Sequence, residues 1–254
     1  EISACLVGSE MCIRDRIIFC LIFIPIAVFF NCSTQALHLR VYNDLPTSIA
    51  DCLVNQKETW LFFSIFITLL FLLLIQNNIK NDFDENFVLR FRSKRRIWKM
   101  QLWKAGIYAL LFSLYYTLCT LVFGSLYSQS FINWGHEASA YYVELKIVNS
   151  FVSFSQVALT FFIACALSLF CASLLFLLLL WLPGGHILSW IVMLCFLCWD
   201  SFFPQYALFA ERVSIEYSNW AANDLWQGFL VETVLIILFS VAGFVTSQKK
   251  EFLK

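Results

Sequence analysis

Charged side chains within apolar segments are the residues of this sequence best suited to do chemistry. Asp200 and Glu232 each lie close to one end of a long apolar run, the external end in the topology predicted below. Ionisable groups are costly inside a bilayer, and those that occur there commonly line the path of a substrate or an ion. Two interpretations stay open. Either both carboxylates line a translocation path, or both are solvated by headgroups and water at the membrane interface.

Signatures of the common catalytic sites do not occur. The sequence contains no G-x-S-x-G, H-E-x-x-H or P-loop pattern. Its three histidines, His38, His136 and His186, fall in separate polar segments, so we expect no metal site and no other cofactor. A membrane enzyme acting on lipids would have to combine Asp200, Glu232 and His136, which lie far apart in the sequence. The sequence therefore favours a protein that is not an enzyme.

The composition is that of an integral membrane protein. Hydrophobic residues make up 61% of the 254 residues and charged residues 13%, whereas globular domains carry about 25% charged residues. We predict an all-α, polytopic fold with about six transmembrane helices in one domain over residues 17–254. The predicted spans are 17–31, 60–76, 105–124, 147–182, 187–203 and 228–246. The segment 147–182 is longer than one span requires, so it is either a single tilted helix or a helix broken near its serine-rich start.

The long basic segment 84–104, DENFVLRFRSKRRIWKMQLWK, sets the predicted orientation. Arginine and lysine between two spans are retained on the cytoplasmic side of the membrane. Both chain ends are then cytoplasmic (N-in, C-in), and the loops that become external are near neutral or acidic. Since the membrane already accounts for these cations, we do not expect a nucleic-acid partner.

Two further features concern the N-terminal part of the chain. Residues 1–16, EISACLVGSEMCIRDR, resemble a translated sequencing-adapter artefact, so we expect them to be a non-native leader that displaces the native N-terminus. Of the ten cysteines, Cys32 and Cys52 fall in the polar segment 31–59, which is predicted to be external. In that location they either form a disulfide at the base of the loop or remain free thiols.

The layout resembles the permease subunit of type-2 ABC exporters, with a coupling segment between spans two and three and an extended last external segment over residues 205–226. In detail, FVLRFRSKRRIWKMQLWK (87–104) is similar to a basic, aromatic stretch in small permeases of Gram-positive bacteria. Several of these accompany bacteriocin or lantibiotic export and self-immunity. The family's amphipathic helix before the first span is not visible in this sequence.

The resemblance implies a multi-pass protein of a bacterial cell membrane, of Gram-positive type, that works as a homo- or heterodimer of permeases. A separate ABC ATPase subunit would hydrolyse the ATP. Residues implied to contact this ATPase are Asp84, Phe87, Arg90, Phe91, Arg92, Lys94, Arg95, Arg96, Trp98 and Lys99. The exported cargo would be a peptide, a lipid-like molecule or an antimicrobial compound. The alternative is an integral membrane protein for immunity or assembly that transports nothing.

Overall fold

The computed structural model describes residues 2–42, 45–59, 61–79, 82, 93–182, 185–203, 206–209 and 212–249. These residues form helices and connecting segments, with an isolated β-bridge between Ser48 and Ser130. Among them, six helices are long and apolar enough to cross a membrane. The predicted all-α architecture with about six membrane spans is therefore confirmed.

Long helices alternate with short ones along the chain. The long helices are α1 (Ile2–Leu37), α3 (Thr68–Ile79), α5 (Lys94–Tyr127), α7 (Phe154–Trp181), α8 (Gly185–Phe202) and α10 (Leu225–Lys249). The shorter ones are η1 (His38–Tyr42), α2 (Ile49–Glu58), η2 (Phe62–Ile67), α6 (Ala140–Leu145) and α9 (Tyr217–Ala222), of which η1 and η2 are π-helices. The candidate spans cover 21–41, 62–79, 94–127, 154–181, 185–202 and 225–248.

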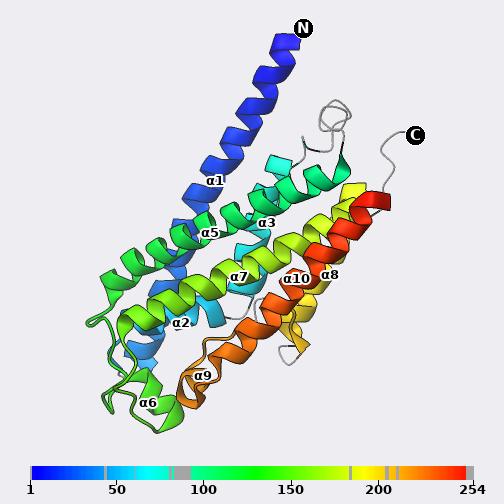
Figure 1. Ribbon diagram of the computed structural model, residues 1–254. Helices are drawn as coiled ribbons and strands as arrows, with labels where there is room; N and C mark the ends of the chain where they lie inside the picture. The colour runs from blue at the N-terminus through cyan, green and yellow to red at the C-terminus, as the bar shows by residue number, and fades with distance from the viewer. Residues whose placement is uncertain are drawn as a thin grey trace.

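The spans run up and down through one bundle. α1 begins and α10 ends at the same end of the bundle as the first turn of α5, and we call this the terminal end (Figure 1). The short helices α6 and α9 lie at the opposite end, which we call the loop end (Figure 1). The start of α1 and the end of α10 thus lie on one side, as expected for an even number of spans (Figure 1).

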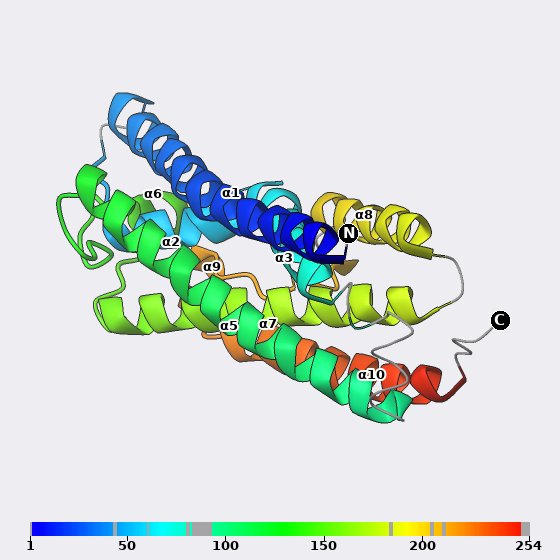
Figure 2. The same cartoon turned by 90° about the horizontal axis from the view of Figure 1, so that it is seen from above.

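α7 is the central helix of the bundle. In the apolar part of α7, 72% of the residues are buried, compared with 11% in α10. α7 packs against α5, α10, α8 and α2. It lies between the other spans in two perpendicular views (Figure 1, Figure 2). Its start is fixed by a capping box in which the Ser153 and Gln156 side chains each bind the other's backbone N–H. The helix therefore begins at Phe154, and residues 147–153 are not helical, which differs from both predicted alternatives.

α5 is longer than the bilayer requires. Its 34 residues extend for about 51 Å at 1.5 Å per residue, whereas the hydrocarbon core is about 30 Å thick. The predicted third span began at residue 105, but the helix begins at Lys94 because nothing in the basic segment interrupts it. The first turns of α5, residues 94–104, are called the basic turns below.

The largest departure from the predicted layout is α2. Residues 31–59 were expected to form an external polar loop. Instead, α1 continues to Leu37, and α2 packs inside the bundle against α1, α5 and α7. A capping box between Ser48 and Asp51 begins α2. The free N–H groups of Ile49 and Ala50 donate to the carbonyl oxygens of residues 130 and 131, at 3.0 Å each, which fixes the first turn of α2 to the loop end.

Candidate functional site

A break between α2 and η2 places polar groups in the interior of the bundle. α2 ends at Glu58, and Leu61 then adopts a left-handed backbone conformation (φ 65°) before η2 begins. For a residue other than glycine this conformation costs about 1–2 kcal/mol. Interrupted helices among membrane spans are a common way to build substrate sites, because they expose backbone and polar groups at depth.

Lys57, at the end of α2, is the charged residue that enters the interior from this break. Its side chain is 1% exposed, and its ammonium lies 4.7 Å from the centroid of the Phe63 ring. Lys57 and Asp200 both interact electrostatically with Glu232. Asp200 and Glu232 are themselves fully buried. The two carboxylates predicted from the sequence are thus both buried and interact electrostatically with each other.

The two carboxylates have different surroundings. Asp200 Oδ1 accepts hydrogen bonds from the backbone N–H groups of Leu208 and Phe209, at 2.5 and 2.8 Å. Glu232 interacts with Ser168 of α7. Within the described part of the chain, however, neither Glu232 oxygen nor the Ser168 hydroxyl has a hydrogen-bond partner of good geometry. We refer to Lys57, Ser168, Asp200 and Glu232 as the polar cluster.

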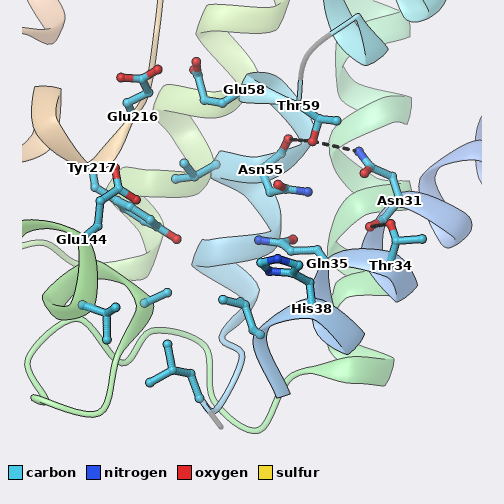
Figure 3. A pocket seen from close by; sticks show the side chains of 15 residues that line it. Asn31, Thr34, Gln35, His38, Asn55, Glu58, Thr59, Glu144, Glu216 and Tyr217 are labelled. Atoms are coloured by element: carbon cyan, nitrogen blue, oxygen red, sulfur yellow. Dashed lines mark hydrogen bonds between the residues drawn. The ribbon is translucent and has the colours of Figure 1, made fainter. Parts of the chain in front are cut away.

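A cavity of about 760 Å³ opens beside the break towards the loop end. We call it the vestibule (Figure 3). Side chains from α1, η1, α2, α6 and α9 surround it, and Glu58 and Thr59 at the end of α2 belong to its lining. The labelled lining residues are Asn31, Thr34, Gln35, His38, Asn55, Glu58, Thr59, Glu144, Glu216 and Tyr217. Three of these are acids, and none of the described lining residues is lysine or arginine, so this part of the wall favours neutral or cationic ligands.

The acids of the vestibule are shifted towards their neutral forms. Burial raises the pKa of Glu58, whose carboxylate accepts hydrogen bonds from the backbone N–H of Ile215 at 2.6 Å and from the Ser214 hydroxyl at 3.2 Å. Burial, and the neighbouring carboxylate of Glu216, raise the pKa of Glu144. Both groups thus exchange protons at less acidic pH than free glutamate does.

A buried carboxylate, Asp51, holds the loop end of the bundle together. Its Oδ1 accepts hydrogen bonds from the indole of Trp134 at 2.8 Å and from the hydroxyl of Tyr217 at 2.9 Å, and its Oδ2 accepts two from Ser48. Burial raises the pKa of Asp51, and these hydrogen bonds oppose that rise. Trp134 also stacks on Tyr141, with ring centroids 5.0 Å apart. Asp51 therefore joins α2 to α9 and to the loop after α5, and so shapes the vestibule wall.

Asp51, Lys57 and Glu58 were not among the residues proposed from the sequence, because all three were assigned to an external loop. Two signals point to the helix that carries them. Ser48 and Asp51 have the spacing of a capping box, and Ile49 and Leu53 are four residues apart, the spacing of neighbours on one helix face.

The residues predicted to contact an ATPase separate into three groups. Arg95, Arg96 and Lys99 are exposed on the basic turns, and Lys94 is half-buried at their start. Trp98, in contrast, is 1% exposed and donates from its indole to the carbonyl of Ser240 at 3.2 Å, so it packs α5 against α10. The remaining predicted contacts, Asp84, Phe87, Arg90, Phe91 and Arg92, lie outside the described residues.

The cysteines and histidines form no further site in the described part of the chain. Cys32 and Cys52 are buried neighbours that interact with each other, but both are free thiols, so the predicted disulfide is not present. Cys32 and Cys52 lie close together because α1 packs on α2, where each cysteine acts as a small apolar side chain. No three His, Cys, Asp or Glu side chains among the described residues are arranged to hold a metal ion.

The chain matches no protein-family model, no curated protein and no solved structure. Its function is therefore inferred from the vestibule, the polar cluster and the basic turns.

Proposed function

We propose that the chain is the membrane-spanning permease subunit of an ATP-driven transporter, coupled to a separate ABC ATPase at the basic turns. It exports a peptide, a lipid-like molecule or an antimicrobial compound. The observation that carries this proposal is that exposed cations stand on the first turns of a helix that continues unbroken for 34 residues. Force applied at the basic turns would pass along α5 into the bundle.

The proposed orientation places the terminal end in the cytoplasm. Positive charge concentrates there, on Arg95, Arg96 and Lys99 at the start of α5, and cations resist translocation across the membrane. The vestibule then faces outward, and the ATPase meets the basic turns from the cytoplasmic side.

The described contacts suggest how closure of the ATPase would reach the polar cluster. Trp98 ties the basic turns to Ser240 of α10, and α10 also carries Glu232. α5 packs against α7 and α2 as well. In the proposed cycle, a push on the basic turns moves α5 and α10 together past α7 and changes the environment of the polar cluster and the vestibule. Two permeases, identical or different, would enclose the path.

The test is co-purification with an ABC ATPase encoded beside this gene. Reversing the charge of Arg95, Arg96 and Lys99 together should abolish recovery of the ATPase, because like charges then meet at the interface. Lys146→Glu is the matched control, since this exposed cation lies at the loop end. If both variants retain the ATPase as the wild type does, the docking role is wrong, and a protein for immunity or assembly becomes the better explanation.

A further inference from the structure

Glu232 is a buried carboxyl group whose oxygens have no hydrogen-bond donor. Its side chain is fully buried on α10. Among the described residues, neither carboxylate oxygen has a hydrogen-bond partner. Asp200 is buried to the same degree, but two backbone N–H groups stabilise its charge. A carboxylate that is buried without such donors is strongly destabilising unless a cation accompanies it.

Charged and polar groups on three other helices interact with Glu232. Lys57 faces it from α2 and Asp200 from α8. Ser168 faces it from α7, as do the thiols of Cys165 and Cys171.

The positive charge in this region is shared. Lys57 interacts with the carboxylate of Glu58 as well as with that of Glu232. Its ammonium also lies against the Phe63 ring. The Lys57 ammonium thus attracts both the Glu58 and the Glu232 carboxylate. The Asp200 carboxylate disfavours a negative charge on Glu232. Glu232 therefore shares its cation with a second acid and lies near a further buried carboxylate, so binding of another cation would stabilise it.

The chemistry of the surroundings selects a proton as that cation. A metal ion requires several ligands, and no set of three His, Cys, Asp or Glu side chains in the described part of the chain provides them. A proton requires one carboxyl oxygen and benefits from one acceptor. The Ser168 hydroxyl lies beside Glu232 and has no other hydrogen-bond partner among the described residues.

We propose that Glu232 is a reversible proton-binding site inside the bundle, with Ser168 as the acceptor for its O–H group. In the proposed resting arrangement one proton is bound to one carboxylate oxygen. When the bundle rearranges and water or the Lys57 ammonium reaches the carboxylate, the O–H bond breaks and the proton leaves to water. Its use in a transport cycle rests on the proposed function, but the binding of the proton does not.

The vestibule offers a route for this exchange. Glu58 and Thr59 line the vestibule, and Lys57, the residue before them, faces Glu232. α10, which carries Glu232, is tied to the basic turns through Trp98 and Ser240. Movement of α5 would therefore shift Glu232 relative to Lys57, which stays on α2.

Infrared spectroscopy of the purified protein in lipid nanodiscs tests the site. A protonated carboxyl group has a C=O stretch that is separate from the amide bands and shifts in D₂O. The wild type should show such a band at neutral pH, and Glu232→Gln should lose it. Glu144→Gln is the matched control, because it removes a carboxyl group of the vestibule and should leave the band in place. The proposal is overturned if the wild type has no band that Glu232→Gln removes.

A second variant keeps the acid and changes only its acceptor. Ser168→Ala should retain the band but move it to higher frequency, because the O–H group loses its hydrogen bond. An unchanged frequency would show that Ser168 is not the acceptor and would overturn that part of the proposal. These spectra need neither ATPase nor cargo, so their outcome is independent of the co-purification that tests the proposed function.

Discussion

Gly243 of α10 lies against the Trp98 ring of α5, and replacing it with alanine tests that packing. A Cβ added to Gly243 would lie 1.9 Å from Cζ2 and 2.1 Å from Cη2 of Trp98. Carbon atoms in contact are normally about 3.5–4.0 Å apart, so the indole must leave its site or the two helices must separate. Either change breaks the hydrogen bond from the Trp98 indole to the carbonyl of Ser240.

The expected loss of stability is the sum of three effects. Overpacking costs up to about 3 kcal/mol, and the lost hydrogen bond costs about 1 kcal/mol. Alanine gains about 1 kcal/mol over glycine in a helix. We therefore expect Gly243→Ala to lose about 3 kcal/mol, the total of these effects.

Gly106→Ala is the matched control, because it makes the same change in a membrane-spanning helix. There the new Cβ would meet Phe170 at 3.6 Å, an ordinary contact, so the variant should gain up to about 1 kcal/mol. The two variants should then differ by about 4 kcal/mol, on the order of 10 °C in melting temperature for a chain of this size. The assay is thermal unfolding in detergent, followed by circular dichroism.

A compensating change distinguishes a specific clash from a general effect. Trp98→Leu removes the ring that the new Cβ would meet, so Gly243→Ala should cost little in that background. Such non-additivity is expected only for residues in contact. If Gly243→Ala is as stable as Gly106→Ala, or if Trp98→Leu fails to rescue it, the close approach of α5 and α10 described here is wrong.

Three further predictions concern the loop end and the orientation. Asp51→Ala removes the acceptor of four hydrogen bonds, and the buried donors of Trp134 and Tyr217 alone cost about 1–3 kcal/mol each when left unpaired. Its melting temperature should therefore fall well below that of Asp224→Ala, a change at an exposed acid; equal values would contradict the role of Asp51. Burial raises the pKa of Glu58 above 4.5, so the folded protein holds this proton more tightly than the unfolded chain, and stability should fall as pH rises from 4.5 through the raised value. The free energy of unfolding, measured with urea at several pH values in that range, should change less with pH in Glu58→Gln than in the wild type. If it changes equally with pH in both proteins, Glu58 is not the source of the pH dependence. Reporter fusions should place residue 94 in the cytoplasm and residue 151, whose side chain is 95% exposed at the loop end, outside; the reverse result would overturn the N-in, C-in topology.

Apolar runs predicted the membrane spans because hydrophobic length is a local property of the sequence. The apolar runs did not predict where a helix begins or ends when polar residues extend it beyond the run. α5 extends back to Lys94 through arginines and lysines because these are good helix formers and no proline or glycine separates them from the span. The helix of the first span likewise continues past residue 31, to Leu37, because polar residues extend it beyond the apolar run.

The candidate site was only partly predictable, since burial of polar groups depends on packing between distant segments. Asp200 and Glu232 were recognisable as charges near apolar runs. Lys57 belongs to a stretch whose mixed charge is typical of an exposed loop, and its burial follows from the packing of α2 against α5 and α7. Trp98 illustrates the opposite error. Its place in a basic, aromatic stretch suggested a partner contact, but a glycine 145 positions later accommodates its ring inside the bundle.

The way α2 is attached has a mechanical consequence. Backbone hydrogen bonds fasten its first turn to the loop after α5, whereas its last turn stops at a kink with a left-handed residue. Because backbone hydrogen bonds to another segment hold α2 at its start, whereas the kink follows its end, we expect α2 to move at its end. Displacement of the neighbouring spans should therefore be absorbed near Leu61, leaving the loop-end mouth of the vestibule rigid while its floor changes shape.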